Sequence, residues 1–317
     1  PPVRQHEPAR LPPPVGPAPA VRREAAAAGL ARARGRRGPR RAAGGRAGAV
    51  GLSTGLIYVP GGFGGETALE VYDPAADSWQ TRTPLPAPRH HLMVAAHQGL
   101  LYVFGGAMGG GWQPAADAWV YDPVADSWRA LAPMPEARLA GAAVSLGSHL
   151  YIVGGSGGSQ ALLRYDPAAD RWASLATLEQ AREHTAAAVL NGHIFALGGR
   201  WAGTGELASV EVYDPEADVW QPGPSMNRAR AGFAAAVLQG HLFVLGGEII
   251  IAGRQTLAEV EVYDPATEQW SSAPSLPVAL HGVPAVAADE AVYVLGGSDR
   301  AAGVDNQGRV LIYRPRR

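Results

Sequence analysis

The sequence predicts an all-β protein, a β-propeller of six blades in which each blade is a four-stranded antiparallel sheet. A short apolar run ends in a glycine pair six times, at Gly61/Gly62, Gly105/Gly106, Gly154/Gly155, Gly198/Gly199, Gly246/Gly247 and Gly296/Gly297. These pairs lie 44, 49, 44, 48 and 50 residues apart, the length of one propeller blade. Each pair is followed by Tyr-Asp-Pro, degraded to Tyr-Arg-Pro in the sixth copy, and five copies have a Trp six residues after the Asp position. A register kept over six units predicts the architecture before any single residue is interpreted.

Residues 137–175 show the expected elements of one blade in order. Four short apolar runs fall within 137–146, 149–155, 161–167 and 168–175, and turn residues separate them. The first two strands of a blade are expected to meet at polar turns such as Gly147-Ser148, Asn191-Gly192 and Gln239-Gly240. The last two meet at Asp-Pro-x-x-Asp, where Pro presets φ and the first Asp accepts turn amides. We therefore expect a four-stranded meander in every complete repeat.

The repeated residues are expected to build the ring and to have no direct part in function. Glycine pairs allow positive φ where inner strands crowd together, and each repeated Trp supplies contact area on an outer strand. A blade is apolar on both faces because it packs against a neighbour on each side. His149, His193 and His241 begin second strands at equivalent positions, so we expect them on the rim opposite the glycine pairs.

Length and composition favour one closed domain with a basic tail. The chain has 317 residues, 47% of them hydrophobic, and residues 46–317 accommodate six blades. Residues 1–45 are rich in Arg, Ala and Pro and nearly free of β-branched and aromatic residues, so we expect them to be disordered. Residues 1–46 hold 11 Arg and 2 Glu, whereas the remainder holds 16 basic and 26 acidic residues. Because no aromatic residue is interleaved with the tail arginines, we expect no nucleic-acid binding.

Composition also excludes several classes of function. The chain has no Cys, which excludes disulfides, thiolate metal sites, cysteine nucleophiles and the Tyr-Cys copper chemistry of galactose oxidase. No signal-peptide core and no transmembrane segment are present in these residues, and the sequence assigns no compartment. We expect no cofactor and no metal, because His91 and His184 share an equivalent position but lack acidic companions at a known distance. We expect a monomer.

The glycine pair after an apolar strand, with Tyr and then Trp following in register, resembles the kelch repeat over residues 46–317. WD repeats have a similar period, but their Gly-His and Trp-Asp signatures are absent. The kelch resemblance implies that the first-strand entry and the loop after the glycine pair lie on one face, around the channel mouth. It also implies that this loop-rich face carries recognition.

The resemblance places a set of basic and aromatic candidates at that rim. Arg89, Arg138, Arg182 and Arg230 stand sixteen residues before a glycine pair, and Leu280 breaks the series. The complete set of candidate ligand-binding residues is Arg89, His91, Arg138, Arg182, His184, Arg200, Trp201, Arg230 and His281. Such a rim would suit an anionic peptide or an acidic sugar, because Arg presents a fork of donors to carboxylates. Alternatively, the repeated Arg pairs with neighbouring acids such as Glu136, Glu179 or Glu183.

Blade six is expected to be incomplete or closed by the N-terminal region. Blade one can take its inner strand from residues 46–53, but the sixth repeat reaches residue 317 without a Trp strand. Propellers usually complete one blade from both ends of the chain, which removes exposed strand edges. Residues 22–34 favour helix over strand, which argues against a patch from that part of the tail.

Two functions remain open at this point. The first is a non-catalytic kelch module that binds a protein or peptide over its loop-rich face, where Trp112 and Trp201 lie outside the repeated Trp positions. The second is a kelch enzyme similar to the sialic-acid mutarotases, which needs a positioned acid/base and an Arg for the substrate carboxylate. Its candidate residues are Arg138, Arg182, Glu183 and His184. No nucleophile, base and orienting group stand in a recognisable order, so the sequence favours the binding module.

Overall fold

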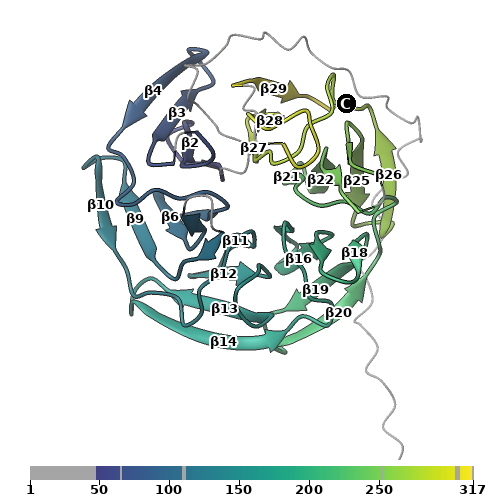
Figure 1. Cartoon of the computed structure of the whole chain (residues 1–317), viewed down its shortest axis with the longest axis horizontal. Helices are drawn as coiled ribbons and strands as arrows, with labels where there is room; N and C mark the ends of the chain where they lie inside the picture. The colour runs from purple at the N-terminus through teal and green to yellow at the C-terminus, as the bar shows by residue number, and fades with distance from the viewer. Residues whose placement is uncertain (1–47, 65, 109–111, 252, 304–307, 316–317) are drawn as a thin grey trace, which may run out of the picture.

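The computed structural model is a ring of six antiparallel sheets around a central channel (Figure 1). It describes residues 48–64, 66–108, 112–251, 253–303 and 308–315. Five sheets have four strands and the sixth has three. The predicted six-bladed all-β propeller is therefore confirmed, and blade six is incomplete in the described part of the chain.

The strands run outward from the channel in chain order within each blade. Blade one consists of β1 (Val50–Gly51), β2 (Ile57–Pro60), β3 (Leu69–Asp73) and β4 (Ser78–Arg82). Blade two consists of β5 (Met93–His97), β6 (Leu100–Phe104), β9 (Ala118–Asp122) and β10 (Ser127–Ala130). Blade three consists of β11 (Ala142–Leu146), β12 (His149–Val153), β13 (Ala161–Asp166) and β14 (Arg171–Thr177).

The second half of the ring repeats this order. Blade four consists of β15 (Ala186–Leu190), β16 (His193–Leu197), β19 (Val210–Asp214) and β20 (Val219–Gly223). Blade five consists of β21 (Ala234–Leu238), β22 (His241–Leu245), β25 (Val260–Asp264) and β26 (Gln269–Ala273). Blade six consists of β27 (Ala285–Ala288), β28 (Ala291–Leu295) and β29 (Val310–Tyr313). First strands of neighbouring blades contact one another around the channel.

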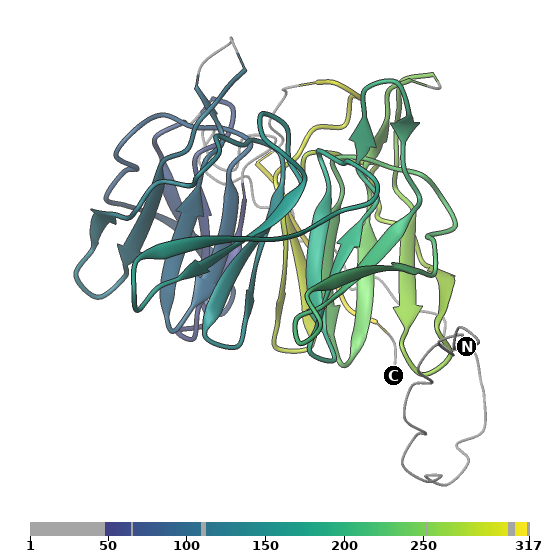
Figure 2. The same cartoon turned by 90° about the horizontal axis from the view of Figure 1, so that it is seen from below.

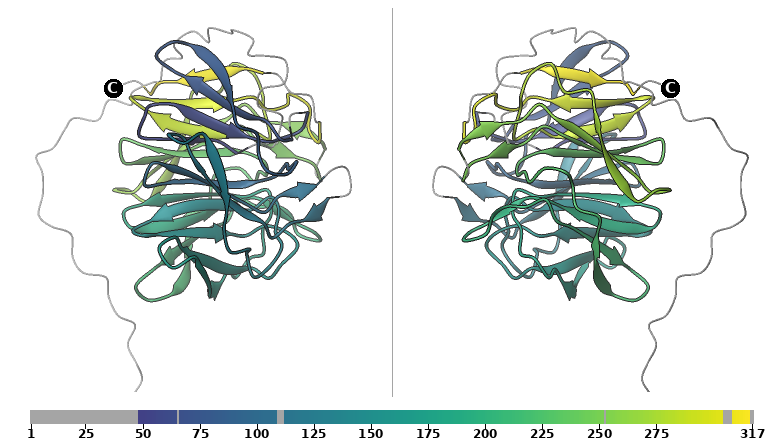
Figure 3. Two further views of the ribbon diagram at one scale, coloured as in Figure 1. Left: turned by 90° about the vertical axis from the view of Figure 1, so that its left-hand side faces the viewer. Right: turned by 90° about the vertical axis from the view of Figure 1, so that its right-hand side faces the viewer.

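Three small hairpins project from one face of the ring, between the second and third strands of a blade. They are β7 (Ala107–Met108) with β8 (Gln113–Pro114), β17 (Arg200–Trp201) with β18 (Gly205–Glu206), and β23 (Glu248–Ile249) with β24 (Gln255–Thr256). Figure 2 shows the hairpins on its upper side, and the blue β7–β8 hairpin extends from the same face in Figure 3. We call this the loop-rich face, and the opposite one, which carries the tight turns, the turn face.

Turns and glycines behave as the sequence predicts. At Asn191-Gly192, φ is 51° and 80°, the left-handed pair that a two-residue hairpin turn requires. The Asp73 carboxylate accepts the amide hydrogens of Ala75 and Ala76 at 2.8 and 3.0 Å, and equivalent Asp side chains do so in other blades. A Cβ on Gly105, where φ is 55°, would lie 2.3 Å from the Arg138 carbonyl oxygen. Only glycine fits there.

The core lies between the blades. Each cluster of buried apolar side chains joins the facing surfaces of two neighbouring sheets, as where Val144, Tyr151 and Val153 of blade three meet Ile194 and Tyr213 of blade four. The apolar runs therefore have no polar face, because both faces of a sheet are covered. No helix in the described part of the chain has the length and apolar character needed to cross a membrane.

Candidate functional site

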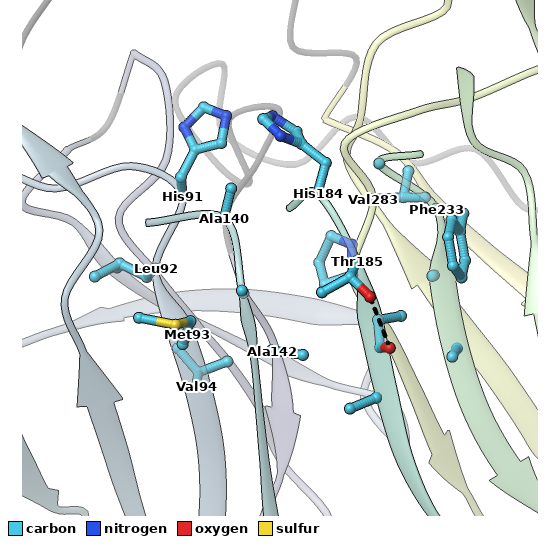
Figure 4. A pocket seen from close by; sticks show the side chains of 18 of the residues that line it. His91, Leu92, Met93, Val94, Ala140, Ala142, His184, Thr185, Phe233 and Val283 are labelled. Carbon is cyan, nitrogen blue, oxygen red and sulfur yellow. Dashed lines mark hydrogen bonds between the residues drawn. The ribbon is translucent and has the colours of Figure 1, made fainter. Parts of the chain in front are cut away.

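The channel opens on the loop-rich face, where the first strands begin. The cavity there has a volume of about 180 Å³ and is lined mainly by the first strands and the residues just before them, including Ala140, Ala142 and Thr185 (Figure 4). His91 and His184 stand at its mouth on opposite sides. Their ring centroids are 5.0 Å apart, so blades two and four meet across the opening.

The two histidines occupy an unusual backbone position. His91, Ala140, His184, Gly232 and Gly282 are equivalent by repeat and have φ of 55°, 56°, 48°, 59° and 62°. A left-handed conformation costs a residue other than glycine about 1 kcal/mol or more. Amide-to-carbonyl bonds hold this belt together, from Ala140 to His91 at 3.1 Å, from Gly232 to His184 at 2.8 Å and from Gly282 to Gly232 at 2.7 Å. The belt fixes both imidazoles at the mouth.

An aromatic cluster covers one side of the mouth. Phe63 stacks on His90 with ring centroids 4.3 Å apart, and Trp112 lies 4.5 Å from His91 and 6.3 Å from His184. These residues come from the blade-one loop, the blade-two entry, the β7–β8 hairpin and the blade-four entry. Trp112 is 42% exposed and presents part of its ring to solvent.

A chain of charged groups covers the other side. The Arg200 Nε donates to Glu183 Oε1 at 2.7 Å, and its Nη1 donates to Glu248 Oε1 at 3.2 Å. Glu183 Oε2 lies 2.8 Å from His184 Nδ1. Burial alone would raise the pKa of Glu183, but the hydrogen bond and charge of His184 and the Arg200 guanidinium outweigh it and hold this pKa at about 2. Glu183 is therefore an ionised carboxylate that orients both Arg200 and His184.

Glu248 extends this chain to blade six. Its fully buried carboxylate lies 3.0 Å from His281 Nδ1 and accepts the Ala302 amide hydrogen at 2.7 Å. The other ring nitrogen of His281 lies 2.7 Å from the Arg300 carbonyl oxygen, to which it donates. Blades four, five and six are thus joined on the loop-rich face by one network of charged and polar groups.

The four repeated arginines lie below this surface. Arg138, Arg182 and Arg230 have no exposed area and Arg89 is 3% exposed. Arg182 Nη1 donates to the carbonyl oxygens of Gly198 and Ser209 at 2.8 and 3.0 Å, and its Nη2 donates to Glu211 at 2.7 Å. These bonds tie the end of the second strand to the start of the third. A ligand at the mouth does not reach such a guanidinium without a rearrangement of the blade.

In blades four, five and six, the residue two positions before the repeated Tyr matches the residue at the Arg position in chemistry. In blade four Arg182 pairs with Glu211, and in blade five Arg230 pairs with Glu261. In blade six both positions are apolar, since Leu280 and Leu311 pack in one core cluster. This explains why Leu280 interrupts the Arg series: blade six has an apolar Leu-Leu pair at the two positions where blades four and five have an Arg-Glu ion pair.

Blades two and three match their arginines differently. In blade two Arg89 pairs with Asp117, and its guanidinium carbon lies 5.2 Å from the centre of the Trp119 ring. In blade three Arg138 pairs with Glu136 at 2.8 Å, as the sequence suggests. The acid that pairs with Arg182 is Glu211, and not Glu179 or Glu183, because the guanidinium points along the blade toward the third strand.

Of the predicted rim residues, the structure brings His91, His184, Arg200 and His281 to the mouth, with Trp201 beside Arg200 on β17. It adds residues that the candidate set lacks: Phe63, His90, Glu183 and Glu248 at the mouth, and the exposed Met108 and Ile251 on hairpins. Met108 and Ile251 do have a signal in the sequence, since each is a large apolar residue in an irregular loop outside the repeat. Within the described residues, no group of three or more His, Asp or Glu side chains could hold a metal ion.

Comparisons with known proteins agree with this architecture. The model of the KLHDC2/KLHL20/DRC7 Kelch-repeats domain matches residues 132–297, which is more than half of the chain. The chain belongs to the kelch-repeat family. A second model, the Kelch motif, matches residues 88–135, which hold the entry to blade two and its four strands. No curated protein sequence matches the chain.

A solved structure extends the likeness of this kelch propeller beyond the family models. The structure described as "Structure of YjhT" superimposes with a TM-score of 0.74, covering 87% of this chain and 99% of that chain. The two sequences are 16% identical, so the likeness concerns the fold.

Proposed function

We propose that this kelch propeller is a non-catalytic binding module that takes a protein or peptide partner on its loop-rich face. The observation that carries this proposal is the placement of exposed apolar side chains on the hairpins of that face. Met108 is 49% exposed, Trp112 42% and Ile251 65%. Large apolar and aromatic side chains at the centre of a face are the usual anchors of protein interfaces.

The hairpins that carry these anchors are supported from below. The Glu206 carboxylate of β18 accepts the amide hydrogens of Ile250 and Ile251 at 2.8 and 3.2 Å, which joins the hairpins of blades four and five. The Trp112 ring packs against His91 and His184, whose backbones are held by the belt of left-handed residues. A surface that is ordered before binding loses less conformational entropy on association.

Two variants on opposite faces test this proposal. Affinity capture with a Trp112→Ala/Ile251→Asp chain should recover at least about tenfold less partner than the wild type, the equivalent of about 1.4 kcal/mol. Val124 is 94% exposed in an outer turn of the turn face, so Val124→Asp is the matched control and should leave recovery unchanged. The proposal fails if both variants lose the partner equally or if the loop-face variant keeps it.

One observation favours a second candidate, a carbohydrate enzyme acting on acidic sugars. The Glu183 carboxylate orients His184 at the mouth, and an imidazole positioned by a carboxylate is a common proton-transfer arrangement. Glu183 itself is too weak a base for that task, because its pKa is about 2. Arg138 and Arg182 are buried in their blades, which removes the two donors expected to bind a substrate carboxylate.

Saturation-transfer NMR with a panel of acidic sugars separates the two candidates. The binding module predicts no transfer to any sugar. Transfer that disappears in His184→Gln, together with faster interconversion of the sugar anomers by the wild type, would establish the enzyme instead.

A further inference from the structure

The four methionines of the chain differ sharply in their exposure to solvent. Met108 is 49% exposed, whereas Met93, Met134 and Met226 are 1%, 3% and 3% exposed. The chain has no Cys, so the thioethers of these four residues are its only sulfur groups. Peroxides convert a methionine thioether to the sulfoxide, and exposed sulfur atoms react first. Met108 therefore carries the sulfur atom that a dissolved oxidant reaches directly.

The other three methionines are enclosed by the packed core. Met93 and Met134 belong to the core cluster of blades two and three, and Met226 belongs to that of blades four and five. A Cβ on Gly105 would lie 2.8 Å from Met134 Cε and 2.9 Å from Met93 Cε, so both side chains pack against the Gly105 backbone. An interior of ordinary packing density leaves no room for an added oxygen atom. These three residues are therefore internal controls for Met108.

The register of the β7–β8 hairpin sets the exposure of Met108. The preceding residue, Ala107, is fully buried and exchanges two backbone hydrogen bonds with His90, at 2.8 and 3.1 Å. Met108 pairs with Gln113 in the ladder of this hairpin, which projects from the loop-rich face (Figure 3). Successive side chains of a strand point to opposite sides, so a buried Ala107 turns Met108 outward. The thioether is thus held in solvent by the ring.

Met108 shares the loop-rich face with Trp112 and Ile251, the other exposed apolar side chains that we propose as anchors, so the inference rests on the proposed function. An unbranched, polarizable Met side chain adapts its shape to an apolar partner surface. Its sulfoxide is polar and chiral, and the added oxygen accepts hydrogen bonds. Burying this oxygen against an apolar partner without a donor weakens binding. Oxidation of one atom therefore opposes the interface.

The fold itself does not depend on the Met108 side chain. Met108 belongs to none of the core clusters in the described part of the chain. The β7–β8 hairpin is a separate two-stranded sheet outside the four strands of blade two. Changes to surface side chains that lie outside the core usually have small effects on stability. Oxidation at this position therefore alters binding and leaves the ring intact.

We propose that Met108 is a reversible oxidation site that regulates partner binding on the loop-rich face, with hydrogen peroxide as the oxidant. The sulfur lone pair attacks one peroxide oxygen, the O–O bond breaks as the S–O bond forms, and the second oxygen leaves as water after proton transfer. Met108 loses two electrons and the peroxide gains them. In the reverse step a methionine sulfoxide reductase takes two electrons from a dithiol, which becomes a disulfide, and the sulfoxide oxygen leaves as water.

Peroxide treatment followed by mass spectrometry of proteolytic peptides tests the site without any partner. In the folded chain the Met108 peptide should gain one oxygen atom at least about tenfold faster than the peptides of Met93, Met134 and Met226. In concentrated urea all four should react at similar rates, which controls for intrinsic reactivity. The Tm of the oxidised chain should change by less than about 2 °C. Similar rates in the folded chain, or a larger fall in Tm, would overturn the proposal.

Partner binding is then measured on the oxidised chain. It should recover about tenfold less of the protein that the untreated wild type captures, and sulfoxide reductase with dithiothreitol should restore the recovery. Met108→Leu keeps an apolar side chain without sulfur, so it should bind like the wild type before and after peroxide treatment. If peroxide abolishes binding by Met108→Leu as well, the effect belongs to another residue and the inference is wrong.

A comparison with Trp112→Ala/Ile251→Asp separates this inference from the proposed function. If that variant loses the partner and the oxidised chain keeps it, the loop-rich face binds the partner but Met108 does not regulate binding. That result refutes the inference alone. If the variant and the oxidised chain both keep the partner, the proposed function is refuted with it.

Discussion

The pairing of Arg230 with Glu261 in blade five predicts a specific pattern of mutant stabilities. Arg230 has no exposed area and donates from Nη1 to the carbonyl oxygens of Gly246 and Glu259 at 2.8 and 3.0 Å. Glu261 is 3% exposed and also accepts the Asn227 amide hydrogen, at 2.6 Å. Either residue alone would be a buried charge without its counter-charge.

We expect Arg230→Leu and Glu261→Leu each to destabilise the protein by about 3–5 kcal/mol, because each leaves one uncompensated buried charge. For a domain of this size that is a fall in Tm of roughly 6–10 °C, at about 2 °C per kcal/mol. The double variant recreates the Leu280 and Leu311 pair of blade six, and it should lose about 2 kcal/mol or less. The two substitutions should therefore be strongly non-additive.

Thermal unfolding of the four proteins, followed by circular dichroism, measures the coupling directly. Arg228→Leu is the control: Arg228 is partly exposed and pairs with Glu259 near the surface, so its Tm should change by less than about 2 °C. If the double variant loses the sum of the two single losses, the two side chains do not act as a unit. The assignment of the repeated arginines to blade construction would then be wrong.

Three further predictions address the mouth, the ring and the hydrogen bond that joins the outer edges of blades two and three. The pKa of Glu183 is lowered from 4.5 to about 2 in the folded protein, so its ionised carboxylate adds up to roughly 3 kcal/mol to the free energy of unfolding above pH 4.5. This contribution is lost as the pH falls toward 2. The free energy of unfolding of Glu183→Gln, measured with urea, should therefore equal that of the wild type near pH 2 and be lower at pH 6. Gly105→Ala should lower the Tm by several degrees, because the new Cβ meets the Arg138 carbonyl and φ is positive; an unchanged Tm would contradict the required close approach. Trp172→Phe, which leaves the Ala132 carbonyl without its donor, should cost about 1 kcal/mol in the same assay, and no loss would show that water replaces the indole.

Much of the ring was predictable because the same sequence signals recur in every blade. A glycine pair with positive φ, an Asp in a tight turn and a Trp on an outer strand are local requirements of each blade, and each recurs at a fixed spacing. The sixth copy, which has three strands in the described part of the chain, was recognisable for the same reason, because it lacks the repeated Trp. Features that depend on local backbone conformation can therefore be predicted from the sequence.

The direction in which a side chain points is a different matter. The sequence places the four repeated arginines at the entry to the first strands. In the structure their guanidinium groups point into the blade toward the third strand, where Arg182 pairs with Glu211, 29 residues further along the chain. The sequence suggested Glu179 and Glu183 as partners of Arg182, because both lie within three residues of it along the chain. Only the packed sheet shows which acid the guanidinium reaches.

The sequence by itself determined the six-bladed kelch architecture, its turns and the copy in which it is imperfect, since these follow from periodic local interactions. The tertiary structure decided which residues meet at the mouth: Trp112 on His91 and His184, and Arg200 between Glu183 and Glu248. These contacts join different blades, so their partners are set by ring closure and not by distance along the chain. The non-repeating residues that we propose for binding could be recognised as a group only once the ring had brought their blades together.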